Sequence, residues 1–327
     1  MQAQCLLRAR PGISTPERRL PETGTFRTGN VSDPVQPGVT SKEDVVHHIG
    51  VIGSGLMGSG IAQVAAQAGL QVGLNDANAD ALHSALARIC TGLERLRDRG
   101  RLEGDVDTIL SRIHLTTDLQ EFAQSDVVIE AISENEDLKC TLFAQLDGIC
   151  APRTILASNT SSISITNLAA ATHRPKCVVG MHFFNPVPAM QLVEVTRGTA
   201  TSDHTVAKIT QLGERLGKTV VHAADTPGFI VNRILVPMLV EAIFVYQEHA
   251  ASREDIDQAV RLGLGHPMGP LTLADLIGLD TLLAICDVYY QEFGDPKYRA
   301  PILLRRYVTA GWLGRKTGRG FYEYPAR

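Results

Sequence analysis

A histidine and a glutamate twelve residues apart carry side chains suited to acid–base chemistry. His182 lies in the segment GMHFFNPVP at 180–188, and Glu194 follows in LVEV at 192–195. An imidazole titrates near physiological pH, so it can take a proton from an alcohol and later return it. A buried carboxylate bonded to the other ring nitrogen would fix the tautomer. Spacing alone does not bring the two together, and a hydrogen-bonded histidine under an aromatic pair is the alternative.

A glycine-rich segment is typical of nucleotide binding. Residues 53–58 read GSGLMG, which fits G-x-G-x-x-G between an apolar strand and a helix. The three glycines allow a tight turn, close approach of a pyrophosphate, and close packing of the helix. The helix N-terminus then holds the phosphates. The cofactor contacts predicted here are Gly53, Ser54, Gly55, Leu56, Met57 and Gly58.

An acidic residue further along the chain indicates which dinucleotide is bound. Asp76 ends the second predicted strand, 21 residues after Gly55. It would accept hydrogen bonds from the adenosine ribose and would repel a 2′-phosphate, so NAD is favoured over NADP. The alternative is a glycine turn in an ordinary strand–helix unit, with Asp76 as a helix cap.

These residues need a sheet to position them, and the chain provides the pattern for one from Val45 onward. Strands are expected at 45–53, 71–76, 112–117, 126–132, 154–160, 176–184, 190–197 and 219–224. Helical stretches alternate with these strands, including one with an apolar stripe at i, i+4, i+7, i+11 and i+14. The members of this stripe are Leu82, Leu86, Ile89, Leu93 and Leu96. The alternation predicts an α/β fold of Rossmann type, with a mostly parallel sheet covered by helices.

The pattern changes after residues 225–228, which read DTPG. Helices are expected at 229–249, 252–263, 270–276, 278–293 and 300–310. We therefore predict an NAD-binding Rossmann domain over 45–226 and an all-α substrate and dimerisation domain over 227–327, with the boundary near Pro227. A loop within one large domain is the alternative.

Composition indicates a chain with sizeable hydrophobic cores. It lacks the features of proteins that bind nucleic acid, membranes or metal ions. Hydrophobic residues make up 44% of the 327 residues, and the net charge of −4 provides no field for attracting nucleic acid or an anionic membrane. The apolar stretch that most resembles a membrane span, 234–246, follows Arg233 and contains Pro237 and Glu241, so it is too short and too charged to span a bilayer. The six cysteines show no metal-ligand spacing. We expect no metal, reduced thiols and a cytoplasmic location.

The first 44 residues differ from the rest, with five prolines, five arginines and no sustained apolar period. We expect a disordered extension. Residues 1–16 contain two arginines and no acid, as in a mitochondrial transit peptide, which would place the protein in the matrix. The prolines argue against an amphipathic helix, and an unstructured extension or a start codon assigned too early is the preferred interpretation.

Several motifs together resemble one enzyme family. They are SNTSS at 158–162, GMHFFNPVP at 180–188, LVEV at 192–195, DTPGFIVNRIL at 225–235, HPMGPLTLADLIGLD at 266–280 and GRKTGRGFYEY at 314–324. From about Val45 to Tyr324 the chain resembles the 3-hydroxyacyl-CoA dehydrogenases, in particular the short bacterial 3-hydroxybutyryl-CoA dehydrogenase type.

The resemblance implies roles for four residues in catalysis. His182 matches the histidine that removes the 3-hydroxyl proton as hydride leaves carbon 3, and Glu194 matches its carboxylate partner. Ser161 and Asn232 match a serine and an asparagine that bind the substrate. Without the resemblance, SNTSS would be a strand end with a helix cap and Asn232 a buried capping residue.

The resemblance also implies further cofactor contacts. Asn159 and Asn185 match positions near the nicotinamide ribose and ring, and Glu134 and Lys139 match a pair beside the cofactor. Relatives usually carry ENLELK where this chain reads ENEDLK at 134–139, so the local polarity differs while Glu134 and Lys139 keep their places. An ordinary solvated pair around a helix start is the alternative for these two.

Basic residues at two other places are candidates for anion binding. Arg88, Arg95 and Arg99 lie beside the apolar stripe and suit the nucleotide phosphates of CoA, a solvated basic helix face being the alternative. Lys316 would reach the cofactor if the C-terminal segment folds back over the first domain, and would otherwise be a surface lysine.

Taken together, the sequence predicts an NAD-dependent L-3-hydroxyacyl-CoA dehydrogenase that acts on an acyl-CoA, with short chains favoured, and forms a homodimer. One alternative is a related dehydrogenase of a hydroxy acid without CoA, of gulonate or carnitine type. Another is a nucleotide-binding protein that has lost turnover, as some crystallins have.

Overall fold

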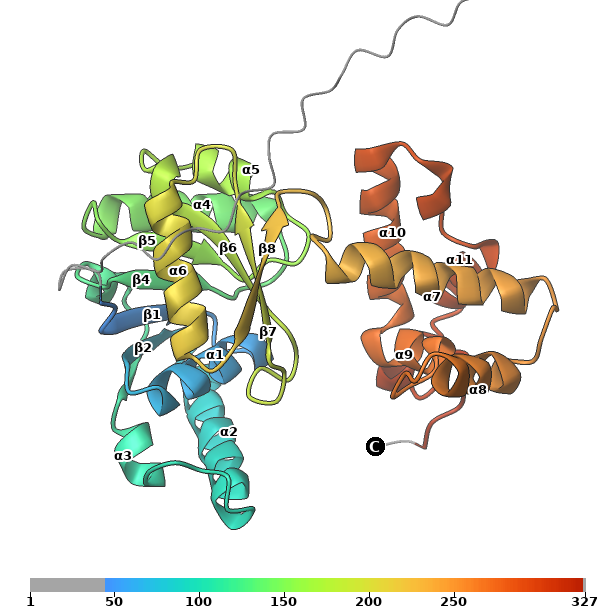
Figure 1. The fold of residues 1–327 in the computed structure, drawn as a ribbon, viewed down its shortest axis with the longest axis horizontal. Coiled ribbons are helices and arrows are strands. Elements are labelled where there is room, and N and C mark those ends of the chain that lie inside the picture. Colours follow the sequence, from blue (N-terminus) through green and yellow to red (C-terminus); the bar gives the residue numbers. More distant parts are fainter. Residues whose placement is uncertain (1–44, 326–327) are drawn as a thin grey trace, which may run out of the picture. The chain divides into compact units, whose positions relative to one another are not determined.

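The structure is a computed structural model, and it describes residues 45–325. The predicted N-terminal extension, 1–44, therefore lies outside the described residues. Within them, the architecture is an eight-stranded sheet with surrounding helices, followed by a helical region (Figure 1). The predicted α/β fold of Rossmann type is confirmed.

The sheet contains every strand expected from the sequence. The strands are β1 (His48–Ile52), β2 (Gln71–Asn75), β3 (Ile113–Thr116), β4 (Val127–Glu130), β5 (Ile155–Ser158), β6 (Val178–Phe183), β7 (Leu192–Arg197) and β8 (Thr219–Ala224). Their order is β3-β2-β1-β4-β5-β6-β7-β8, and every neighbouring pair is parallel except β6 and β7. Strand order reverses between β1 and β4, the switch point where sheets of this kind bind ligands.

Helices connect and cover these strands. They are α1 (Leu56–Gln67), α2 (Ala79–Asp98), α3 (Val106–Leu110), α4 (Glu136–Ile149), α5 (Ile165–Ala170) and α6 (Asp203–Arg215), with the 3₁₀ turns η2 (Leu119–Phe122) and η3 (Pro175–Cys177). In α1 the alanines at 62, 65 and 66 are fully buried, so this small-residue helix lies close to the sheet. In α2 the predicted stripe faces the core: Leu82, Ile89 and Leu93 are buried.

The helical region begins after β8. It contains α7 (Val231–Gln247), α8 (Arg253–Gly263), α9 (Pro270–Ile277), α10 (Leu279–Phe293) and α11 (Ile302–Thr309), with the 3₁₀ turns η4 (Pro296–Tyr298) and η5 (Arg315–Thr317). Each of these five α-helices matches a predicted helix within two residues at each end, whereas the two 3₁₀ turns were not predicted. Gly278, at φ 103°, ends α9 and separates it from α10, because few other residues adopt this conformation without strain.

The helical region has a hydrophobic cluster of its own, whose buried members all come from residues 236–321. The division into domains at Pro227 stays a prediction. None of the helices in the described part is both long and apolar enough to cross a membrane. The cysteines between residues 45 and 325 are all free thiols, as expected.

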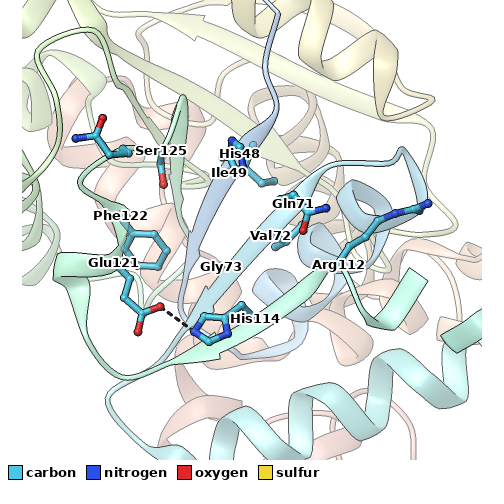
Figure 2. A pocket seen from close by; sticks show the side chains of 11 residues that line it. His48, Ile49, Gln71, Val72, Gly73, Arg112, His114, Glu121, Phe122 and Ser125 are labelled. Atoms are coloured by element: carbon cyan, nitrogen blue, oxygen red, sulfur yellow. Dashed lines mark ion pairs between the residues drawn. The ribbon is translucent and has the colours of Figure 1, made fainter. Parts of the chain in front are cut away.

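On β1 and β2, two glycines make room for an aromatic ring. A Cβ at Gly73 would lie 2.7 Å from Phe122 Cε1, and a Cβ at Gly50 would lie 2.6 Å from Phe122 Cδ1. Figure 2 shows the Phe122 ring lying beside Gly73, in a hollow of 270 Å³. The hollow includes the first residues of β1 and β2, so it lies away from the carboxyl edge of the sheet where the cofactor motif ends.

This packing predicts a stability difference between two glycine-to-alanine variants. We expect Gly73→Ala to destabilise the protein by about 1–3 kcal/mol, because the new methyl group has to displace the Phe122 ring. Gly148→Ala is the matched control, since that position is exposed in α4 and a Cβ there meets no atom within 4 Å. It should be neutral or stabilise by up to about 1 kcal/mol. Urea unfolding measures both, and equal shifts would contradict the packing argument.

Candidate active site

The register of the antiparallel strand pair brings the predicted histidine and glutamate together. His182 in β6 lies directly opposite Glu194 in β7, so both side chains project from the same face of the sheet. His182 Nδ1 lies 2.8 Å from Glu194 Oε2, and the two side chains are 8% and 0% exposed. An ionised carboxylate only accepts hydrogen bonds, so the imidazole proton lies on Nδ1 and Nε2 is the acceptor.

The second oxygen of Glu194 holds the start of α7. Glu194 Oε1 accepts hydrogen bonds from the backbone N–H groups of Ile230 at 3.1 Å and Val231 at 2.9 Å. These groups belong to the N-terminus of a 17-residue helix, where unpaired N–H groups and the helix dipole favour a negative charge. This contact does not follow from the sequence motifs, and only the DTPGF turn before the helix hints at it.

Two aromatic rings enclose the imidazole. The ring centroids of Phe184 and Phe229 lie 4.5 Å and 5.8 Å from that of His182. The histidine therefore combines both interpretations made from the sequence: it is a buried, hydrogen-bonded residue beside aromatic rings, and it also has the carboxylate partner. No residue between 45 and 325 donates a hydrogen bond to Nε2, which leaves this atom for a reacting group.

The glycine loop has the close contacts that its motif requires. A Cβ at Gly58 would lie 1.7 Å from the carbonyl oxygen of Gly53, whose own φ is 98°. Gly55, the N-cap of α1, has nothing within 4 Å of its Cβ position, so its backbone is open to a ligand. Ser54 is buried, Met57 is half-buried and Leu56 is exposed. The loop thus fits a dinucleotide pyrophosphate at the N-terminus of α1.

Asp76, which directly follows β2, supports the glycine loop. Its Oδ2 accepts hydrogen bonds from both the backbone N–H and the hydroxyl of Ser54, each at 2.8 Å. Partial burial acts to raise the pKa of Asp76, but the hydrogen bonds from Ser54 outweigh it and lower the pKa below the usual carboxyl value. The carboxylate is therefore charged and lies beside the glycine loop, where the motif requires it.

The three predicted arginines, Arg88 and Arg95 in α2 and Arg99 directly after it, differ in their contacts. Arg88 Nη2 donates a hydrogen bond of 2.7 Å to the carbonyl oxygen of Ser54, so it holds the glycine loop. All three residues, Arg88, Arg95 and Arg99, are exposed. The prediction that all three bind CoA phosphates therefore stays a prediction, and Arg88 has a contact with the cofactor loop that the sequence did not suggest.

The SNTSS loop after β5 is held by a glutamate. Glu134 Oε1 accepts hydrogen bonds from Thr160 Oγ1 at 2.6 Å, from the backbone N–H of Ser161 at 3.0 Å and from Ser162 Oγ at 3.0 Å. The Glu134 side chain is 40% exposed; its partial burial acts to raise its pKa, but Lys139 and the Thr160 hydroxyl lower the pKa overall. Glu134 thus orders the residue predicted to bind the substrate, Ser161.

A second carboxylate contacts this loop, and none of the sequence motifs points to it. Glu130, the last residue of β4, is 0% exposed, and its Oε1 lies 2.7 Å from Lys139 Nζ. Lys139 is 1% exposed, and its Nζ also lies 3.0 Å from Glu134 Oε2. Burial raises the pKa of Glu130, although Lys139 acts to lower it. The signal available in the sequence was an acidic residue closing the apolar run VVIE at 127–130.

The remaining predicted residues have varied surroundings. Asn159 Oδ1 accepts a hydrogen bond of 2.9 Å from the backbone N–H of Phe183, which ties the SNTSS loop to β6. Asn185 is exposed and precedes a cis peptide bond to Pro186. Asn232 lies half-buried in the first turn of α7.

Lys316 lies in η5 near the C-terminus, where its Nζ forms an ion pair of 2.6 Å with Asp280. Its predicted contact with the cofactor stays a prediction. Between residues 45 and 325 no group of three or more His, Cys, Asp or Glu side chains could hold a metal ion.

Known proteins of one family match nearly all of the described chain. Residues 48–226 match the family described as 3-hydroxyacyl-CoA dehydrogenase, NAD binding domain, and residues 228–324 match the C-terminal domain of the same family. A probable 3-hydroxybutyryl-CoA dehydrogenase of Deinococcus radiodurans is 56% identical over 275 residues, covering 84% of this chain and 99% of that protein. A second, from Bacillus subtilis, is 52% identical over 280 residues, covering 85% and 98%.

A solved structure is similar as well. The (S)-3-hydroxybutyryl-CoA dehydrogenase of Ralstonia eutropha has a TM-score of 0.84 and 49% identity, covering 86% of this chain and 100% of that one. These matches cover both the sheet and the helical region. The chain belongs to the 3-hydroxyacyl-CoA dehydrogenase family.

Proposed function

We propose that this protein is an NAD-dependent L-3-hydroxyacyl-CoA dehydrogenase that interconverts 3-hydroxyacyl-CoA and 3-oxoacyl-CoA, with 3-hydroxybutyryl-CoA as the preferred substrate. The observation that carries the proposal is the buried hydrogen bond of 2.8 Å between His182 and Glu194. His182 lies near the carboxyl end of β6, and the glycine loop follows the carboxyl end of β1. β1 and β6 run in the same direction, because the pairs β1–β4, β4–β5 and β5–β6 are all parallel. The glycine loop and His182 therefore lie at the same edge of the sheet.

The residues around the glycine loop fit the cofactor. The loop at 53–58 would hold the pyrophosphate, and Asp76 would turn from Ser54 to the ribose hydroxyls of the adenosine. Bound NAD supplies the acceptor for the hydride that leaves carbon 3 of the substrate. Further contacts are proposed for the residues Asn159, Asn185, Glu134, Lys139 and Lys316.

Side chains of the protein accept the proton that leaves the substrate hydroxyl group. His182 Nε2 accepts the proton of the 3-hydroxyl group while the carbon–hydrogen bond at carbon 3 breaks, which avoids both a free alkoxide and a protonated carbonyl. The imidazolium then donates two hydrogen bonds, and Glu194 stabilises the charge from the Nδ1 side. Ser161 and Asn232 are proposed to bind the substrate oxygen and to stabilise the charge that develops on it.

We also propose contacts to CoA, a homodimer contact and a cellular location. The exposed residues Arg88 and Arg95 in α2 and Arg99 directly after it suit the phosphates of the CoA portion. We place a homodimer contact on the helical region, where large apolar side chains such as Ile302 and Leu262 are exposed. A cytoplasmic location agrees with the free thiols.

The function itself can be tested with purified protein. Acetoacetyl-CoA with NADH should lose absorbance at the nicotinamide band, and a series of longer 3-oxoacyl-CoA substrates should give lower kcat/KM. Acetoacetate without CoA is the matched substrate control. If acetoacetate were reduced as well as its CoA ester, the activity would belong to a dehydrogenase of free hydroxy acids. If NADH were bound and neither substrate consumed, the protein would have lost turnover.

The histidine and glutamate can be tested by replacement. We expect His182→Ala to lower kcat by about 10²–10⁴-fold, because the hydroxyl proton loses its acceptor. Glu194→Gln should lower it by at least about tenfold, because an amide does not stabilise the imidazolium. His173→Ala is the control, since His173 is an exposed histidine paired with Asp147, and its kcat should match that of the unaltered protein. An active His182→Ala variant that still binds NADH would show that another group accepts the proton.

Cofactor choice is expected to depend on Asp76. Asp76→Ala should lower the ratio of kcat/KM with NADH to that with NADPH by about tenfold or more, because the repulsion of a 2′-phosphate is removed. Asp80→Ala is the matched control, an exposed acid in the first turn of α2. Steady-state kinetics with both cofactors give the ratio, and an equal change in the two variants would mean that Asp76 does not select the cofactor.

A further inference from the structure

A buried carboxylate, Glu130, lies beneath the loop that carries Ser161 and has no part in the proton transfer described above. It ends β4, and its register neighbours are Ile52 at the end of β1 and Ser158 at the end of β5. It therefore lies at the switch point of the sheet, on the strand next to the glycine loop. A Cβ at Gly53 would meet the carbonyl oxygen of Ala131 at 2.5 Å, so the residue after Glu130 also touches that loop.

Every oxygen of this carboxylate has a partner. Glu130 Oε2 accepts a hydrogen bond of 2.6 Å from Ser158 Oγ, and Oε1 accepts from Lys139 Nζ at 2.7 Å and from the backbone N–H of Ile132 at 2.8 Å. Ser158 Oγ in turn accepts from the backbone N–H of Thr160 at 3.1 Å. Glu130 thus fixes the side chain of Ser158, the first residue of the SNTSS segment.

Lys139 connects this carboxylate to the one that holds the rest of the loop. Its ammonium group lies between Glu130 and Glu134, and the side chain is 1% exposed. Glu134 then binds the hydroxyl group of Thr160, the backbone N–H of Ser161 and the hydroxyl group of Ser162. The loop is therefore held at both ends by two carboxylates that share one ammonium group.

A buried ion pair adds little to stability compared with well-packed apolar side chains, so stability alone gives no reason for these charges. A polar network with every member paired fixes one geometry, because any other arrangement leaves a buried charge without a partner. The geometry fixed here is that of the loop carrying Ser161.

We infer that Glu130 is a positioning residue for the substrate: through Lys139 and Glu134 it fixes the loop 158–162, so that Ser161 is held ready for the acyl-CoA. This inference rests on the proposed dehydrogenase function. Glu130 is 0% exposed, so it acts through the groups to which it is hydrogen-bonded.

Two variants distinguish a role of Glu130 in positioning the loop 158–162 from a role in the stability of the protein. Glu130→Gln keeps the shape of the side chain and removes the charge, and adding Lys139→Met removes the partner charge as well. We expect Glu130→Gln to raise KM for acetoacetyl-CoA about tenfold or more and to lower the unfolding midpoint, because Lys139 is left with one carboxylate in place of two. The double variant should recover the midpoint while KM stays raised. The Kd of NADH, from its fluorescence, should rise by a smaller factor than KM in Glu130→Gln, because the glycine loop proposed to hold the pyrophosphate is fixed by Asp76 and Arg88.

Asp147→Asn is the matched control, because Asp147 is also nearly buried and forms an ion pair of 2.6 Å with Arg174. It should lower the unfolding midpoint and leave KM unchanged. Glu134→Gln should raise KM as Glu130→Gln does, and combining the two should add little further, since both act on one loop.

Two results would overturn the inference. One is a double variant, Glu130→Gln with Lys139→Met, that regains both stability and the normal KM, since Glu130 would then serve stability alone. The other is a Glu130→Gln variant that weakens NADH binding and leaves the KM of acetoacetyl-CoA unchanged. Absence of turnover in the unaltered protein would instead refute the dehydrogenase function, so the two failures are distinguishable.

Discussion

The carboxylate of Glu194 is the group on which the rest of the site depends. It is fully buried, and a buried charge is stable only where hydrogen bonds replace the water that it has lost. Its two oxygens meet this requirement in different ways, one with the imidazole of His182 and the other with backbone N–H groups at the start of α7. One side chain therefore orients the proposed base and also ties the first turn of α7, which carries Asn232, to β7.

The same requirement explains the polar residues at the carboxyl edge of the sheet. Parallel strands are buried on both faces and are mostly apolar along their length, so polar groups collect where the strands end. Glu130 follows this pattern at the end of β4, with Lys139 and Ser158 as its partners. Glu134 and Asp76 hold the loops on either side of the switch point. The loops that would meet substrate and cofactor are thus fixed by charged groups that lie at or just beyond the ends of the strands.

Much of the fold could be read from the sequence because its signals are local. The β-branched runs gave all eight strands, and the stripe at Leu82, Ile89 and Leu93 gave the buried face of α2. The ends of elements were less certain, since they depend on single residues: Gly278 separates two helices, and Pro301 delays the start of α11 to Ile302. The sequence pattern also did not reveal the antiparallel pairing of β6 and β7, because pairing direction depends on contacts between strands.

By itself the sequence determined the types of chemical group and their order along the chain: a glycine loop, an acid after the second strand, a histidine and a glutamate. It could not determine whether the histidine and glutamate meet, since twelve residues of separation are compatible with many arrangements. Only the register of β6 against β7 placed them face to face. Tertiary structure alone also showed that Glu130 joins Lys139, Glu134 and Ser158, and that Arg88 binds the glycine loop. The physical reason is that these contacts join distant segments, and the burial that makes a charged group choose its partner exists only after the chain has folded.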